Sequence, residues 1–406
     1  MLQEFLHNFL HNLFKPLLLF FYFGFLIRML NVDFEFPYVI YQGLTMYLLV
    51  AIGWHGGEEL AEIKASSIGH IVGFMITGFV LNFVIGLAAY LLLSRMTALR
   101  RVDKATVAGY YGSDSAGTFA TCVAVLAGVG LAFDAYMPVM LAVMEIPGCL
   151  VALYLVARLR HRGMDPDGNM PDEPGYVAPV PARVGPGAAA QPAPGQGLDI
   201  DREPDTEERV QFALTKRRRA AWANGNGEGL LSRKLLREVF LNPGLCLLFG
   251  GIVIGFVSGL QGHKVTHDAD SLFITAFQGA LCLFLLEMGM TAASKLQDLK
   301  SAGRGFILFG LLAPNLFAPL GIIVAQAYAY LTDTALAPGT YVLFAVLCGA
   351  ASYIAVPAVQ RLAIPEASPT LPLAASLGLT FSYNVTIGIP LYIEISRIVG
   401  HWFSVT

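Results

Sequence analysis

The chain has 406 residues, of which 55% are hydrophobic and 14% charged, and its mean hydropathy is +0.61. Soluble domains carry about 25% charged residues, so this composition excludes an ordinary soluble protein and makes lipid the solvent for much of the surface. The net charge of -3 gives no indication of a nucleic-acid partner, and five scattered cysteines in apolar stretches argue against a disulfide framework or a metal site.

Apolar segments follow one another along the whole chain. They cover residues 14–31, 37–54, 68–94, 104–127, 135–158, 240–261, 269–291, 303–331, 338–360 and 370–398. Most have the length of about 20 residues that a membrane-spanning helix needs. Clusters of Gly, Ser and Pro in the fourth and ninth segments predict interrupted helices. We therefore expect an all-α polytopic membrane protein with ten transmembrane helices, two of them broken near the membrane midplane.

The composition changes sharply between the fifth and sixth segments. Residues 163–228 hold Pro/Gly-rich runs and the basic run Lys216–Arg219. Such a stretch buries too little apolar surface to fold alone. We therefore divide the chain into a membrane part at 1–160, a largely disordered linker at 161–235 and a second membrane part at 236–406.

The distribution of basic residues predicts the orientation. The loops after the third, seventh and ninth segments and the ends of the linker are rich in Lys and Arg, whereas the remaining loops are poor in them. Basic loops stay in the cytoplasm. Ten spans then leave both termini outside, with the linker cytoplasmic, in a plasma (bacterial inner) membrane.

Short sequence motifs in the first membrane part are similar to motifs in the second at three places, which occur in the same order. Tyr47–Trp54 resembles Phe284–Met290, Gly112–Ala116 resembles Gly349–Tyr353, and Glu145–Gly148 resembles Gly388–Leu391. Three matches in register favour a duplication. Each half holds five spans, an odd number, so the second copy must be inverted. Inverted five-helix repeats with broken helices are typical of secondary transporters.

Polar residues in the two predicted breaks are the candidates for solute binding. Backbone groups freed by an interruption are tolerated in lipid only when they are buried in protein or line a wet cavity, and a half-helix amino terminus favours an anion. The candidate substrate-binding residues are Gly112, Ser113, Ser115, Thr118, Ser352 and Tyr353. Close helix packing through small residues is the alternative explanation for these stretches.

Charged groups inside apolar spans are functional candidates because they are costly there. Asp114 lies within the first break, beside hydroxyl groups that supply hard oxygen ligands, and is the first candidate for a monovalent cation. Glu145 is the second, and Asn384 is a neutral oxygen donor. An interhelical hydrogen bond is the equally weighted alternative for Glu145. No nucleophile–base pair or Walker motif occurs, so we do not expect an enzyme.

Taken together, these motifs resemble the sodium-dependent bicarbonate transporter family, first known from cyanobacteria. The resembling stretches are Tyr111–Phe119, Met144–Pro147, Leu285–Met290, Ala351–Pro357, Ile364–Pro369 and Gly388–Leu391. The resemblance implies Na⁺-coupled uptake of bicarbonate, a homotrimer within the membrane lipid, and inhibition by a cytoplasmic PII-like protein. It would place Ser113, Ser115, Thr118 and Ser352 at the substrate and sodium sites.

Two departures indicate a distant branch of this family. Cyanobacterial members tend to have an aliphatic residue in place of Asp114 and an acid in place of Tyr353. The sequence therefore predicts a Na⁺-driven symporter of bicarbonate or a similar small anion. The alternatives are a symporter of another small carboxylate or inorganic anion, and a membrane sensor that binds its ligand without transporting it.

Overall fold

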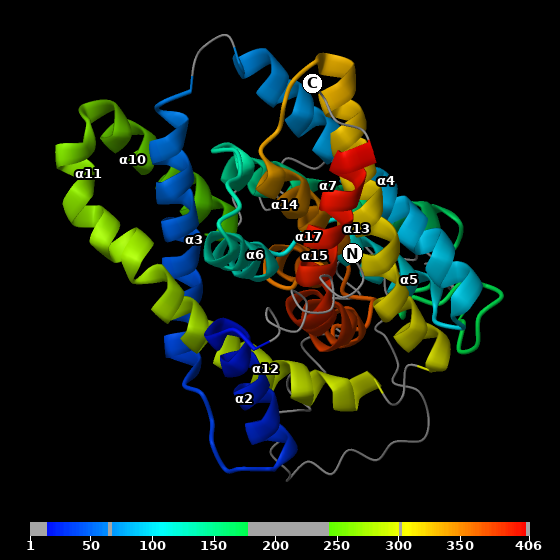
Figure 1. Ribbon diagram of the computed structural model, residues 1–406. Helices are drawn as coiled ribbons and strands as arrows, with labels where there is room; N and C mark the ends of the chain where they lie inside the picture. The colour runs from blue at the N-terminus through cyan, green and yellow to red at the C-terminus, as the bar shows by residue number, and fades with distance from the viewer. Residues whose placement is uncertain (1–13, 64–66, 178–242, 300–302, 403–406) are drawn as a thin grey trace, which may run out of the picture.

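The computed structural model describes residues 14–63, 67–177, 243–299 and 303–402. Within these ranges the chain forms helices joined by loops (Figure 1). In the described part of the chain, five helical stretches are long and apolar enough to cross a membrane, namely Ile68–Met96, Met137–His161, Pro243–Gln261, Ser271–Leu296 and Arg304–Thr332. Pro16–Met29 and Pro338–Gly349 are shorter apolar helices. This architecture is that of a helical integral membrane protein.

Two helix pairs connect the two membrane parts. In each pair, one helix comes from the first membrane part and the other from the second. Helix α3 (Tyr38–Leu60) packs along α10 (Pro243–Gln261), and α2 (Pro16–Met29) packs along α12 (Phe277–Asp298). Figure 1 shows α3 and α10 running side by side at one side of the molecule, with the short α11 (His263–Asp270) continuing from α10.

Glycine explains how closely α3 and α10 approach. Gly53 and Gly57 on α3 face the backbone of α10, and Gly251 and Gly255 on α10 face the backbone of α3. A Cβ atom at Gly251 would lie only 2.6 Å from the carbonyl oxygen of Val50. These glycines, spaced by four positions on each helix, therefore serve helix packing, as small residues with this spacing do in membranes.

The remaining long helices pack around the two interrupted ones. Helix α4 (Ile68–Met96) contacts α7 (Met137–His161), and α13 (Arg304–Thr332) contacts both α4 and α14 (Pro338–Gly349). Pro147 lies inside α7, yet the helix continues through it. The side chains between these helices are buried and largely apolar, and they form the core that holds the interruptions in place.

Both predicted interruptions are present. Helix α5 (Arg101–Tyr111) ends at Gly112, and α6 (Ala116–Val129) begins after Ser115. Helix α14 (Pro338–Gly349) ends at Ala350, and α15 (Ala355–Ala363) begins after Ile354.

The last apolar segment differs from the single smooth span expected at 370–398. It consists of the short α16 (Leu371–Leu373), the π-helical segments η4 (Ala374–Phe381) and η5 (Asn384–Gly388), and α17 (Ile389–Trp402). Pro390 supplies no N–H to the turn before it, which favours a widened helix there. Widened turns are frequent at functional sites because they re-aim side chains.

Residues 162–177, at the start of the predicted linker, form an ordered loop packed against the membrane part, while the division of the chain into two membrane parts and a largely disordered linker stays a prediction. The Asp165 side chain is fully buried and accepts hydrogen bonds from the backbone N–H groups of Asp167 (3.0 Å), Asn169 (2.8 Å) and Val177 (2.9 Å). These bonds fold residues 165–177 into a compact loop. Residues 178–235 of the predicted linker lie outside the described residues.

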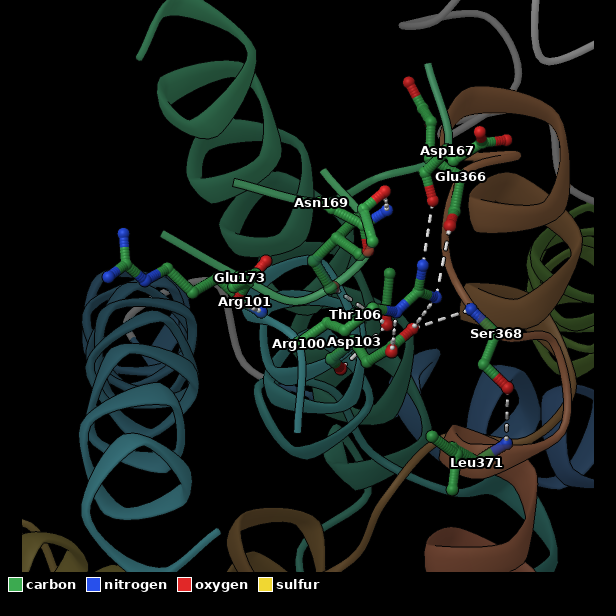
Figure 2. Close-up of polar contacts among 12 residues, drawn as sticks. Arg100, Arg101, Asp103, Thr106, Asp167, Asn169, Glu173, Glu366, Ser368 and Leu371 are labelled. Atoms are coloured by element: carbon green, nitrogen blue, oxygen red, sulfur yellow. Dashed lines mark hydrogen bonds and ion pairs between the residues drawn. The ribbon is translucent and has the colours of Figure 1, made fainter. Parts of the chain in front are cut away.

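A polar junction holds this loop to the start of α5 (Figure 2). Arg100 donates to both carboxylate oxygens of Asp103, at 2.8 and 3.1 Å, and to the Asp167 carbonyl at 2.8 Å. Asp103 also accepts a hydrogen bond from the Ser368 backbone N–H at 2.7 Å. One arginine–aspartate pair thus joins three segments that are far apart in the sequence.

Candidate functional site

The first interruption is held by hydroxyl groups and by a close helix approach. The Ser115 hydroxyl caps α6, accepting hydrogen bonds from the Thr118 backbone N–H (3.2 Å) and hydroxyl (2.9 Å). The Ser113 hydroxyl donates to the Glu145 carbonyl oxygen at 2.9 Å. A Cβ atom at Gly112 would lie 2.9 Å from the Cα atom of Gly86, so only glycine fits beside α4. The break is therefore tied to α4 and to α7.

Asp114 is the buried acidic residue of this interruption. Its side chain has no exposed surface, and neither carboxylate oxygen has a hydrogen-bond partner in another described residue. The carboxyl group of Glu145, itself only 8% exposed, is close enough to act on it by Coulomb repulsion. Two buried acidic groups without a basic partner among the described residues are costly, which makes them a candidate site for a cation or a proton.

The second interruption lies against the first. The Ser352 backbone N–H donates to the Tyr110 carbonyl oxygen, at the end of α5, over 2.9 Å. The Ser352 hydroxyl accepts a longer bond of 3.4 Å from the Val356 N–H in the first turn of α15. Ser352 lies two residues before Ile354, the N-cap of α15, and this long bond reaches the first turn of that helix.

Tyr353 reaches from the second interruption to the first turn of α6. Its hydroxyl oxygen lies directly against Gly117, where any Cβ atom would collide with it. Its ring packs edge-on against Phe381, with centroids 5.5 Å apart. The two interruptions and the π-helical part of the last segment therefore meet at this tyrosine.

Asn384 lies at the second interruption. Its amide nitrogen donates to the Gly349 carbonyl at the end of α14 over 2.9 Å, and its amide oxygen accepts from the Tyr392 hydroxyl over 2.7 Å. The amide is buried, so both bonds hold the break in place. The expected neutral oxygen donor already has a partner within the protein.

Asn82, on α4, is a buried polar residue outside the motifs that mark the two interruptions. Its side chain is fully buried, and its amide nitrogen donates to the Met144 carbonyl over 3.0 Å. Its amide oxygen has no hydrogen-bond partner among the described residues. A signal was available: Asn82 stands midway between Gly78 and Gly86, at helical spacing, within an otherwise apolar segment.

The two interruptions bring helix amino termini, which carry positive partial charge, together with side-chain oxygens that carry negative charge or negative partial charge. The amino termini of α6 and α15 both lie at the breaks, and helix amino termini carry free N–H groups and positive partial charge that favour an anion. The oxygens of Asp114, Glu145 and Asn82 are hard ligands of the kind that monovalent cations take. No group of three or more His, Cys, Asp and Glu residues spaced for a metal occurs in the described part of the chain.

Fold and site together define a helical membrane protein with two interrupted helices that meet at buried polar groups, the design of a secondary transporter. The sequence matches the family model of the Na⁺-dependent bicarbonate transporter superfamily over residues 16–397. The chain therefore belongs to the Na⁺-dependent bicarbonate transporter superfamily. At the level of the family it is a transporter and not an enzyme. No curated protein matches the sequence.

Proposed function

We propose that this protein is a Na⁺-coupled symporter of bicarbonate or a similar small anion. The observation that carries the proposal is the meeting of the two interruptions, where helix amino termini and orphaned acceptor oxygens lie close together. An anion satisfies the amino termini, and Na⁺ satisfies the acceptor oxygens. Each ion also offsets the charge of the other, which couples their binding.

The proposed anion site consists of Gly112, Ser113, Ser115, Thr118, Ser352 and Tyr353. Within this set the hydroxyl groups of Ser115, Ser352 and Tyr353 donate to no described residue, so these uncharged donors are available to a small anion. Asp114 is the proposed principal cation ligand, with Glu145 and Asn384 as secondary candidates. The unpartnered amide oxygen of Asn82 adds a further candidate.

Ten spans in two inverted five-helix repeats account for the packing. In such an arrangement the first helix of one repeat corresponds to the first helix of the other, and likewise the second. The pairing of α2 with α12 is then equivalent to the pairing of α10 with α3, and these are two extensive contacts of the described part. We propose that both termini are outside, that residues 161–235 are cytoplasmic, and that the membrane is the plasma membrane.

Two associations are proposed on the resemblance to the cyanobacterial bicarbonate transporters. They are a homotrimer and a cytoplasmic PII-like regulator. Native mass measurement of the protein in lipid nanodiscs tests the first, and a mass of one or two chains contradicts it. Co-purification of the protein with a PII-like protein from the same cell tests the second.

Uptake into proteoliposomes tests the proposal directly. Labelled bicarbonate should accumulate when an inward Na⁺ gradient is imposed, and K⁺ or choline in place of Na⁺ should abolish accumulation. A panel of unlabelled small carboxylates and inorganic anions should compete less well than bicarbonate. Stronger competition by another anion would reassign the substrate, and saturable binding without accumulation would identify a sensor.

A further inference from the structure

The last residue of α5 reaches across to the second membrane part. Tyr111 directly precedes the first interruption, and its side chain is only 1% exposed. Its ring packs edge-on against that of Phe309 on α13, with the centroids 4.7 Å apart. Its hydroxyl oxygen lies 2.6 Å from that of Thr380, in the π-helical segment η4. Tyr111 therefore contacts two elements of the second membrane part.

Thr380 supplies a hydrogen bond that α13 itself lacks. Its hydroxyl donates to the Gly310 carbonyl oxygen over 3.1 Å. In a regular helix this carbonyl accepts from the N–H four residues later, but that residue is Pro314, which has none. A Cβ atom at Gly310 would lie 2.5 Å from the Leu379 side chain, so η4 runs close against α13 here. The carbonyl of this buried glycine is thus satisfied by Thr380.

The direction of the hydrogen bond between Tyr111 and Thr380 follows from this contact. A threonine hydroxyl has a single proton, and Thr380 gives it to Gly310. Tyr111 is therefore the donor, and Thr380 is the acceptor. The result is one chain of hydrogen bonds from Tyr111 through Thr380 to the Gly310 carbonyl. Because both side chains are buried, the loss of either hydroxyl leaves a polar group without its partner.

Two neighbouring residues at the end of α5 are thus tied to the second membrane part. The Tyr110 carbonyl accepts from the Ser352 N–H, and the Tyr111 hydroxyl donates to η4. The chain leaves the helix at the next residue, Gly112, which has no side chain to restrict its backbone. The position of Ser113 and of the rest of the interruption therefore depends on where the last turn of α5 is held.

We propose that Tyr111 is a positioning residue for the first interruption, and that through Thr380 it holds the turn at residues 112–115 in the arrangement that binds the anion. It acts through the main chain and is not itself part of the anion site. The inference rests on the proposed symport of a small anion. Without this tie the turn occupies several positions, and only a fraction of the molecules is ready to bind. The apparent affinity falls in proportion to that fraction, whereas a saturating anion concentration restores the competent state.

Uptake kinetics of the full-length protein in proteoliposomes test this role. Tyr111→Phe keeps the ring against Phe309 and removes only the hydroxyl. It should raise the KM for labelled bicarbonate by about tenfold and change Vmax by less than about twofold. Thr380→Val removes the acceptor and should raise the KM at least as much, whereas Thr380→Ser keeps a hydroxyl and should retain the wild-type KM. Adding Tyr111→Phe to Thr380→Val should change the KM little further, because both substitutions break the same bond.

Tyr383→Phe is the matched control. The Tyr383 hydroxyl also ties the last segment to α13, donating to the Asn315 side chain over 2.6 Å, but it bonds no residue of α5. Its loss should leave the KM at the wild-type value. A wild-type KM in folded Tyr111→Phe and Thr380→Val, or an equal rise in Tyr383→Phe, would overturn the positioning role. If Tyr111→Phe does not fold, the comparison of Thr380→Val with Thr380→Ser decides, and equal KM values overturn it.

A failure of the proposed function gives a different result. Absence of Na⁺-driven bicarbonate accumulation by the wild-type protein would refute the symport. The Kd for bicarbonate binding to the purified protein then replaces the KM in the same set of variants, with the same rise expected in Tyr111→Phe. If the wild-type protein shows no saturable bicarbonate binding, the positioning role of Tyr111 falls as well.

Discussion

Glu366 is fully buried, and its carboxylate accepts two hydrogen bonds from the Arg160 guanidinium, at 2.8 and 3.0 Å. Arg160 lies in the last turn of α7, and Glu366 lies in the loop after α15, near the polar junction (Figure 2). The pair therefore connects the end of a long helix with the segment that follows the second interruption. It is a two-point contact between groups of opposite charge, of which the acid is entirely shielded from water.

We expect Arg160→Met to be strongly destabilising. The substitution leaves the Glu366 charge buried without its partner, a loss of about 3–5 kcal/mol. Thermal unfolding of the protein in detergent measures it. Replacing both residues by apolar ones, Arg160→Met with Glu366→Leu, should restore most of the loss. Arg397→Met, which breaks the more exposed pair with Glu394, is the control and should cost at most about 1 kcal/mol.

Asp114→Asn should reduce the Na⁺ dependence of uptake far more than it affects folding. The amide has nearly the same shape as the carboxylate, and neither oxygen of Asp114 has a partner in another described residue that the change would break. The measurement is initial uptake in proteoliposomes against Na⁺ concentration. Asp33→Asn, at an exposed loop position, is the matched control. Unaltered Na⁺ activation of Asp114→Asn would remove this residue from the cation site.

Asn82→Leu should raise the Na⁺ concentration needed for half-maximal uptake by about tenfold, the effect of losing about 1.4 kcal/mol of ion binding. Leucine keeps the approximate volume and removes the unpartnered oxygen. The matched control is Asn315→Leu on α13, where the amide nitrogen bonds Leu311 and the oxygen accepts from Tyr383. Equal shifts in both variants would indicate a general loss of packing.

Gly117→Ala should disable transport because its Cβ atom collides with the Tyr353 hydroxyl. Overpacking of this kind costs about 1–3 kcal/mol and displaces the neighbouring groups. Removing the hydroxyl in the double variant Gly117→Ala with Tyr353→Phe should recover part of the lost stability, because the Phe284 ring still lies 2.9 Å from the added Cβ atom. Thermal unfolding of the single and double variants measures the recovery, and additive losses would contradict the contact.

Glu59 should make stability depend on pH. It lies in the last turn of α3, beyond the apolar stretch 37–54. Burial raises the pKa of its carboxyl group above 4.5, although the adjacent His55 opposes the shift. The folded state then holds the proton more tightly than the unfolded chain, so stability falls as the pH rises from 4.5 through the raised pKa.

Thermal unfolding across this pH range tests the contribution of Glu59. Glu59→Gln should remove the corresponding part of the pH dependence and raise the unfolding temperature near neutral pH. Glu35→Gln, at an exposed loop position, serves as the control. A pH profile of Glu59→Gln that coincides with the wild-type profile would contradict this assignment.

The sequence was a good guide to the interruptions because their cause is local. Clusters of Gly, Ser and Pro weaken a helix wherever they occur, and the helices end at Gly112 and Ala350 as the pattern predicts. The sequence was a poor guide to features that arise from distant contacts. The loop around Asp165 is ordered by backbone amides up to 12 residues away and by the junction at Arg100, which its Pro/Gly-rich composition does not indicate.

The same distinction applies to the candidate site. Asp114 was recognisable because a charge inside an apolar span is costly wherever it lies. The amide oxygen of Asn82 has no hydrogen-bond partner among the described residues, whereas that of Asn384 has one. The sequence does not reveal this difference, since both residues are amides in apolar surroundings. It depends on whether a tyrosine reaches the amide oxygen, as Tyr392 reaches Asn384.

The hydrogen bond between the Ser352 N–H and the Tyr110 carbonyl joins main-chain atoms of the two interrupted helices. No side-chain replacement other than proline at position 352 deletes its donor or acceptor. The contact between the two interruptions therefore does not depend on which side chains line it. During a transport cycle we expect both interruptions to travel as one rigid unit, carrying their ions past the remaining helices instead of opening like a hinge between the halves.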